Sequence, residues 1–275
     1  MLIAALLLAA ITPARQFATE SVDRLLESAD PESGMSRFVG YPAQAAKDIF
    51  VPNTNFWART IDFSCASPWN SASGTQRAGT LISKRHVVFA KHFPVGKGAR
   101  ILFVDNEGGV CPCHVDALRP INDCDIMIGL LNAEVTPNIH PAKVLPPDFY
   151  KTFGYDGRVP VVTFNQRERV GVVEMAMSTN AVDTSGITLD ASTDLRKRFT
   201  QTLVGGDSGN PVFMIFGNEP VLLFCVKAGG VGYGPWLFKY HNEIQAAMDA
   251  LCPGYKLEAI DLAAISAMAD KNDAK

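Results

Sequence analysis

The sequence predicts an all-β sandwich or barrel. Between Phe56 and Trp236, short apolar or alternating runs recur, each bounded by turn residues, which is the pattern of consecutive strands. No helical periodicity lies between these runs, so the pattern does not favour alternating strands and helices. The 22 glycines and 17 prolines are scattered along the 275 residues rather than clustered, which indicates a folded chain rich in turns.

The first element is an unbroken apolar run at residues 1–11, followed by Thr-Pro-Ala at 12–14. The run is too short to cross a bilayer core of ~30 Å, but it fits the apolar part of a secretory signal peptide cleaved after Ala14. Because no Lys or Arg precedes the run, a buried N-terminal helix stays open as an alternative, as does a chain that does not begin at its natural start. We expect a signal peptide at 1–14, a secreted or periplasmic protein and no stable membrane anchor.

Residues 15–55 are expected to form an N-terminal extension or pro-segment. Val22, Leu25 and Leu26 recur at helical spacing, and helix-breaking residues at 30–34 follow them. This pattern predicts a short amphipathic helix outside the main domain.

The main domain is expected at 56–251. Apolar runs at 211–216 and 221–226 flank the turn residues 217–220 and predict a β-hairpin. An apolar stripe at helical spacing predicts a C-terminal helix at 240–251, and a weaker helical pattern follows within the tail at 252–275. The remaining predicted strands lie at 79–83, 86–90, 100–104, 125–128, 160–164 and 170–173.

Charge and cysteine content exclude several classes of protein. Twenty-five Lys and Arg against 28 Asp and Glu give a net charge of -3, so no basic field would attract nucleic acid or anionic lipid. The 6 cysteines are too few for a small disulfide scaffold. An exported chain can still carry disulfide bonds, which we expect here, although their pairing cannot be read from the sequence.

The most informative segment is Gly-Gly-Asp-Ser-Gly-Asn-Pro at 205–211, directly before a predicted strand. Small residues on both sides of Ser208 allow a tight turn that exposes the hydroxyl and directs neighbouring backbone N–H groups at one point. A nucleophile beside an oxyanion hole needs this arrangement. A glycine-rich hairpin capped by Asp-Ser is the alternative.

A second segment, at 79–92, predicts two adjacent strands that end at His92. Together the two segments resemble the chymotrypsin-like (trypsin-like) serine protease family. The family's serine motif, G-D-S-G-G-P, matches except at Asn210. Its histidine motif, approximately G-[ST]-L-I-x₃-[HW]-V-[LV]-[TS]-A-[AG]-H, matches at Gly79, Thr80, Leu81, Ile82, His86, Val87, Val88, Ala90 and His92.

The resemblance implies a third member of the site, an aspartate that opens an apolar strand, and Asp125 stands at that place. The chain order His92, Asp125, Ser208 is that of chymotrypsin and differs from the orders in subtilisin and the α/β-hydrolases. The resemblance also implies the fold: two packed antiparallel six-stranded β-barrels and a C-terminal helix. The barrels would cover about 56–145 and 146–239.

The roles of these residues follow from the resemblance. Ser208 would attack the carbonyl of a polypeptide, His92 would carry the proton, and Asp125 would orient His92. The N–H groups of Gly206 and Ser208 would form the oxyanion hole, without metal or cofactor. Thr202 and Gly229 fall at the family's primary specificity pocket, and no carboxylate stands there, which favours a small or apolar P1 residue.

Rival assignments fit less well. An α/β-hydrolase needs G-x-S-x-G, but Asn210 occupies the last position, and only Glu219 could serve as the acid before His241. A metal site at Cys-Pro-Cys-His, 111–114, lacks the ligand spacing of structural zinc, so disulfides or buried thiols are favoured. Asp123 and Asp116 stay open as alternatives to Asp125. His86 is expected to be packed in the barrel.

Three departures from the family pattern support a second hypothesis, a catalytically weak or inactive homologue that acts as a secreted binding module. Phe93 stands where animal members usually carry a disulfide cysteine, Asn210 replaces a glycine, and Lys227 lies near the predicted acid.

The stretch Arg-Phe-Val-Gly at 37–40 resembles the family's activation site, where a new N-terminus would pair with Asp207. A chance tetrapeptide in a loop is the alternative, since bacterial-type members need no such step.

Overall fold

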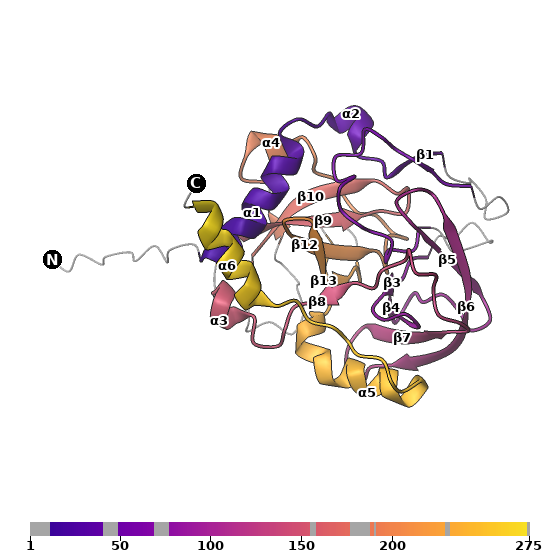
Figure 1. Ribbon diagram of the computed structural model, residues 1–275. Coiled ribbons are helices and arrows are strands. Elements are labelled where there is room, and N and C mark those ends of the chain that lie inside the picture. Colours follow the sequence, from indigo (N-terminus) through magenta and orange to yellow (C-terminus); the bar gives the residue numbers. More distant parts are fainter. Residues whose placement is uncertain are drawn as a thin grey trace.

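The computed structural model describes residues 12–40, 49–68, 77–154, 158–176, 188–189, 191–228 and 232–273. These residues form a mostly β-sheet protein with a C-terminal helix, which confirms the predicted fold class at this level (Figure 1). Two large sheets hold most of the strands, and a two-stranded sheet of β1 (Phe38–Gly40) and β2 (Val51–Pro52) accompanies them.

The first large sheet contains five described strands in the order β3-β4-β7-β6-β5, and all neighbours are antiparallel. Every residue of β4 is buried. His86 at its start is fully buried, with Nδ1 2.8 Å from Ser83 Oγ, so this histidine is packed in the sheet as expected. The strands are β3 (Thr80–Leu81), β4 (His86–Ala90), β5 (Arg100–Val104), β6 (Val110–Pro120) and β7 (Ile126–Leu131).

The second large sheet contains six described strands in the order β11-β10-β9-β12-β13-β8. All neighbours are antiparallel except β8 and β13, which are parallel. Strands β12 and β13 form the predicted hairpin, and Gly217 with φ +63° makes its turn. The strands are β8 (Lys143–Val144), β9 (Arg158–Phe164), β10 (Val170–Ala176), β11 (Thr188–Leu189), β12 (Pro211–Phe216) and β13 (Glu219–Cys225).

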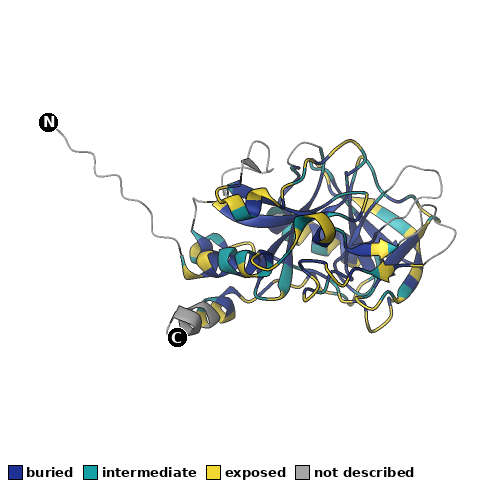
Figure 2. Cartoon of the chain, turned by 90° about the horizontal axis from the view of Figure 1, so that it is seen from above, coloured by how far each residue is buried: buried dark blue, intermediate teal, exposed yellow. Residues whose placement is uncertain are grey.

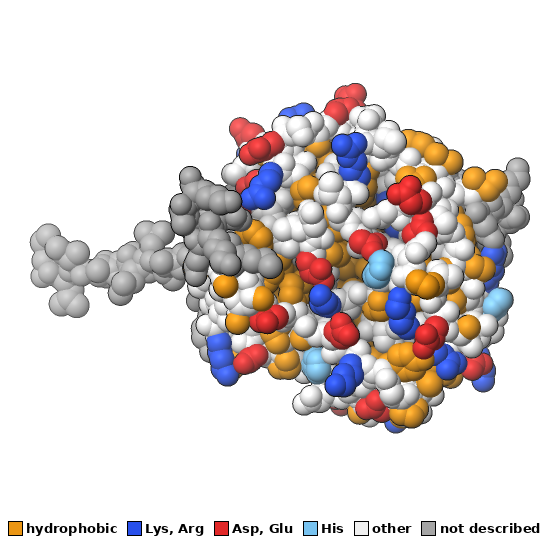
Figure 3. All heavy atoms as spheres, viewed as in Figure 1, with side chains coloured by type: hydrophobic (Ala, Val, Ile, Leu, Met, Phe, Trp, Pro, Cys, Tyr) orange, Lys and Arg blue, Asp and Glu red, His pale blue; other side chains and the backbone are white. Residues whose placement is uncertain are grey.

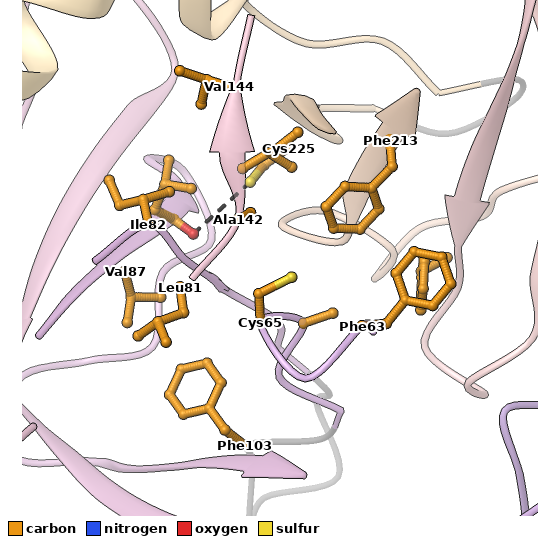
Figure 4. Packing of buried hydrophobic residues seen from close by; sticks show 14 of the residues in the cluster. Phe63, Cys65, Leu81, Ile82, Val87, Phe103, Ala142, Val144, Phe213 and Cys225 are labelled. Carbon is orange, nitrogen blue, oxygen red and sulfur yellow. Dashed lines mark hydrogen bonds between the residues drawn. The ribbon is translucent and has the colours of Figure 1, made fainter. Parts of the chain in front are cut away.

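One buried apolar cluster includes residues of both sheets, and a second lies between the second sheet, α1 and α6. The ring centroids of Phe63 and of Phe213 on β12 lie 5.4 Å apart, and Cys225 Sγ on β13 contacts the Val88 carbonyl oxygen on β4 at 3.8 Å (Figure 4). Buried residues fill the strands inside the molecule, while exposed residues gather in loops and on the outer faces of the helices (Figure 2). The shared core fixes the position of one sheet relative to the other.

Helix α1 (Pro13–Leu26) packs on β9 and β12 of the second sheet and lies beside α6 (Leu262–Asp273) (Figure 1). The predicted helix is present, and it does not stand apart from the sheets, because its buried face, which includes Phe17, Ala18 and Val22, packs on the second sheet. The predicted cleavage after Ala14 falls within the first turn of α1, where Ala14 is fully buried. Residues 1–11, the predicted apolar part of a signal peptide, lie outside the described residues.

The C-terminal helix begins with a 3₁₀ turn at Leu237–Tyr240, which leads into α5 (His241–Leu251). Helix α5 buries Ile244 and Met248 against β6 and β7.

Among the described helices, none has the length and the apolar character needed to cross a membrane. Acidic and basic side chains intermingle on the face shown in Figure 3. The short helices are α2 (Pro31–Gly34), α3 (Tyr150–Phe153) and α4 (Asp194–Lys197).

All six cysteines are free thiols in the structure, so no disulfide bond is seen. Cys111 and Cys113 lie closest, with their Sγ atoms 4.0 Å apart on the buried face of β6. His114 projects from the opposite, exposed face, because side chains alternate along a strand. The alternative metal ligands at 111–114 therefore do not converge on one point.

Candidate active site

Antiparallel pairing of β4 with β7 brings His92 and Asp125 together. Ala90, the last residue of β4, is opposite Ile126, the first residue of β7. One step further, the Lys91 N–H donates to the Asp125 carbonyl oxygen at 3.2 Å. His92 and Asp125 therefore lie side by side at the same end of β4 and β7, although 33 positions separate them in the chain.

Asp125 holds His92 through both carboxylate oxygens. Oδ2 lies 2.7 Å from His92 Nδ1, and Oδ1 accepts the His92 main-chain N–H at 2.9 Å. The Asp125 side chain is 11% exposed, whereas that of His92 is 46% exposed. An acceptor on Nδ1 places the proton there and leaves Nε2 with its lone pair, which is the form needed to accept a proton. Neither Asp123 nor Asp116 makes a described bond to His92.

Ser208 reaches His92 from the second sheet, in the turn before β12. Its Oγ lies 3.0 Å from His92 Nε2, so the three predicted residues form one hydrogen-bonded chain. Gly209 follows with φ +91°, and a Cβ at this residue would lie 2.6 Å from the Ala78 carbonyl oxygen. Glycine is required here because a side chain would face both the strained φ and the clash.

Two backbone donors stand beside the serine. Neither the Gly206 nor the Ser208 N–H donates to any acceptor within the described part of the chain. Gly206 has φ +100°, a conformation that favours glycine. The predicted oxyanion donors, the N–H groups of Gly206 and of Ser208 itself, thus have no acceptor among the described residues.

Asn210, the departure from the family's serine motif, fits the turn. It is 3% exposed and has no positive φ. Its N–H and its Nδ2 both donate to the Asp207 carbonyl oxygen at 3.1 Å. The amide side chain therefore closes the turn that carries Ser208 rather than disturbing it.

Lys227, another departure from the family pattern, contacts Ser208 through its main chain. Its carbonyl oxygen lies 3.3 Å from Ser208 Oγ, and its N–H donates to the Tyr233 carbonyl oxygen at 2.7 Å. The side chain carries Nζ over the Tyr233 ring, 5.8 Å from the centroid. Lys227 also lines an open cleft together with His92 and Asp125, so the cleft runs between residues of both sheets.

Arg77 and Phe93 meet where the family's local disulfide is missing. The Arg77 guanidinium lies over the Phe93 ring, 4.9 Å from its centroid, and Nη1 donates to the Pro94 carbonyl oxygen at 3.1 Å. Phe93 also stacks on His92, with ring centroids 6.3 Å apart. These contacts tie the segment before β3 to the loop that carries His92. Arg77 belongs to no motif in the sequence, and the only signal for it was the absence of the family's cysteine at Phe93.

The activation-site prediction at Arg37 and Phe38 is not supported by the geometry. Asp207 is 1% exposed, and its oxygens already accept the N–H groups of Gln166 at 2.8 Å and Val204 at 2.7 Å. Burial raises the pKa of Asp207, although these two hydrogen bonds act in the opposite direction. Arg37 is 5% exposed and donates to main-chain carbonyls at both ends of its guanidinium. A protease would find this arginine inaccessible.

Of the two predicted specificity residues, Thr202 lies within the described part of the chain. Thr202 is exposed, and the next residue, Leu203, is buried at 2% exposure. A Cβ on Gly232 would lie 2.6 Å from Leu203 Cδ1, so Leu203 fills the space beneath Gly232. Gly229, the other predicted pocket residue, lies outside the described residues.

Two comparisons with known proteins return no relative. A scan against models of protein families finds no match for the chain, and a search among curated proteins finds none either. The functional assignment accordingly rests on the geometry of the site and on the motif resemblance.

Proposed function

We propose that this protein is a serine endopeptidase that resembles the chymotrypsin-like family. The observation that carries the proposal is the hydrogen-bonded chain from Asp125 through His92 to Ser208. Each link lies within 2.7–3.0 Å, the reach expected of a nucleophile, its base and the group that orients the base. The unused N–H groups of Gly206 and Ser208 support the same reaction class.

The geometry supports a two-stage acyl transfer. Ser208 Oγ attacks the peptide carbonyl carbon while its proton passes to His92 Nε2. The carbonyl oxygen becomes an oxyanion and takes hydrogen bonds from Gly206 and Ser208. His92 then gives the proton to the departing amine, and an acyl-enzyme forms on Ser208. A water molecule, deprotonated by His92, releases the acid and restores the serine.

The two-barrel fold and the export of the protein belong to the same proposal. His92 and Asp125 come from the first sheet and Ser208 from the second, which is the division that two six-stranded barrels would give. The open cleft between residues of both sheets suits an extended polypeptide substrate. We place the enzyme in a secreted or periplasmic setting, following the apolar run at 1–11.

Leu203 supports a small P1 residue. Its buried side chain occupies the space beneath Gly232, and the exposed Thr202 offers no charge to bind Arg or Lys. We therefore propose cleavage after small residues such as alanine rather than after basic ones.

Covalent labelling tests the proposal. A fluorophosphonate probe should modify wild-type protein at Ser208 alone, and Ser208→Ala should abolish labelling and lower kcat by about 10⁶-fold. Circular dichroism of both proteins controls for folding. A folded wild-type protein that takes no label and cleaves no peptide favours the second hypothesis, an inactive homologue that binds a partner.

A further inference from the structure

The turn between β9 and β10 holds Gln166 against the loop that carries Ser208. Main-chain bonds close the turn, from the Asn165 N–H to the Arg169 carbonyl oxygen at 3.1 Å and from the Glu168 N–H to the Asn165 carbonyl oxygen at 3.0 Å. Asn165 Oδ1 also accepts the Arg169 N–H at 3.2 Å. These bonds make the turn a rigid support for Gln166.

Gln166 contacts the serine loop at two points. Its main-chain N–H donates to Asp207 Oδ1 at 2.8 Å, while Val204 donates to the other carboxylate oxygen. Its side-chain Nε2 donates to the Gly205 carbonyl oxygen at 3.3 Å. The second contact falls on the peptide group that joins Gly205 to Gly206.

The orientation of that peptide group decides where the Gly206 N–H points. No cis peptide occurs in the described chain, and the C=O and N–H of a trans peptide point in opposite directions. Because the Gly205 carbonyl is turned toward Gln166, the Gly206 N–H is turned away from Gln166. Gly206 allows this close approach, since a Cβ there would lie 3.0 Å from Gln166 Oε1.

We propose that Gln166 is a positioning residue that keeps the oxyanion hole formed. The inference rests on the proposed endopeptidase function and adds a regulatory consequence to it. The side-chain amide fixes the Gly205–Gly206 peptide, and the main-chain N–H satisfies the buried Asp207 carboxylate. Asp207 therefore needs no newly released N-terminus as its partner.

The intact N-terminal segment supports the same turn from its other side. The Arg37 N–H donates to the Glu168 carbonyl oxygen at 2.9 Å, and the Val170 N–H donates to the Met35 carbonyl oxygen at 2.8 Å. Residues 35–37 thus run alongside 168–170. We expect the oxyanion hole to be formed in a chain whose Arg37–Phe38 bond is uncut.

Two substitutions separate the side-chain contact from the rest of the turn. Gln166→Met keeps the length and the main-chain N–H but removes the amide donor. Gln166→Glu sets a carboxylate against the Gly205 carbonyl, and the repulsion favours rotation of the peptide. Arg167→Ala is the matched control, because Arg167 is exposed in the same turn. The substrate is N-acetyl-alanine p-nitrophenyl ester, and the readouts are kcat, KM and Tm.

For Gln166→Met we expect kcat to fall roughly 10- to 100-fold, less than or equal to the loss of a whole oxyanion donor, with a larger fall for Gln166→Glu. KM and Tm should stay close to wild type, and Arg167→Ala should behave as wild type. Wild-type kcat in both variants overturns the proposal, and so does a fall in activity that merely follows a lower Tm. If wild-type protein neither hydrolyses the ester nor takes a fluorophosphonate at Ser208, the proposed function itself fails, and the positioning role falls with it.

Discussion

Asp125 binds the main-chain N–H of His92 with one carboxylate oxygen and the Nδ1 atom of the same residue with the other, at 2.9 and 2.7 Å. The two bonds together fix the backbone position and the ring orientation of the histidine. A single acceptor could not do both, so this pair determines the direction in which Nε2 faces Ser208.

If the proposed function holds, Asp125→Asn should abolish the hydrolytic activity without unfolding the protein. The amide can accept one of the two hydrogen bonds, but its NH₂ group must then face Nδ1, which favours the wrong tautomer of His92. By analogy with the known substitution in the template triad, kcat should fall about 10⁴-fold. Ester hydrolysis measures the loss. Asp116→Asn, at an exposed position of β6, is the control and should keep wild-type activity.

The Arg77–Phe93 contact should stabilise the loop of His92. Arg77→Met keeps the length of the side chain but removes the cation above the ring and the bond to Pro94. We expect a loss of about 1–2 kcal/mol in the free energy of unfolding, measured with urea. Arg119→Met, at an exposed position of β6, should change stability little. Equal effects of the two substitutions would contradict a specific role for the Arg77 contact.

The ionic cluster around Arg196 should hold α1 on the second sheet. Arg196 donates to Asp23 of α1 at 2.7 and 2.6 Å and to Glu174 of β10 at 2.7 Å, and Glu174 is 1% exposed. Arg196→Met leaves Glu174 buried without its cation, which costs about 3–5 kcal/mol of stability. Asp23→Asn should cost less, because the Asp23 side chain is 31% exposed. Urea unfolding of both variants gives the comparison, and an equal cost would argue against this account of the cluster.

Glu168 should make the protein less stable as the pH rises. Burial raises the pKa of Glu168 to about 7, although the charge of Arg37 acts against this shift. Between the ordinary glutamate pKa near ~4.3 and this value, the folded state binds more protons than the unfolded state, so stability falls as the pH increases and then levels off. Glu168→Gln cannot ionise. The urea midpoint of Glu168→Gln minus that of wild type should increase between pH 5 and pH 8. A difference that stays constant with pH would refute a raised pKa of Glu168 in the folded state.

The sequence predicted those features that local patterns encode. The strand runs, the hairpin around Gly217 and the C-terminal helix follow from apolar periodicity and turn residues, and the observed elements agree with them. The structure also brings together His92, Asp125 and Ser208, which motif spacing singled out.

Contacts between distant segments could not be predicted in this way. The sequence assigned Arg37 to a candidate activation site or to a loop, yet its guanidinium is buried, and the carbonyls of Ala66 and Val104 accept its hydrogen bonds. Gln166 carries no motif, and only the packing of its turn against the Gly205 carbonyl reveals it. The partners in these contacts lie 29 or more residues apart, beyond the reach of local periodicity.

Leu203→Ala should widen the specificity pocket that we propose beneath Gly232. Removing the side chain beneath Gly232 vacates apolar space, so a larger P1 group should enter where we propose that the wild type accepts alanine. The ratio of kcat/KM for N-acetyl-phenylalanine to that for N-acetyl-alanine p-nitrophenyl ester should rise about tenfold or more, since a methylene in such a pocket is worth about 1–3 kcal/mol. The variant should also lose about 2–5 kcal/mol of stability. Thr202→Ala serves as the comparison, because its exposed side chain leaves the ratio unchanged; if Thr202→Ala shifts the preference and Leu203→Ala does not, the pocket is formed by the residue first predicted from the sequence.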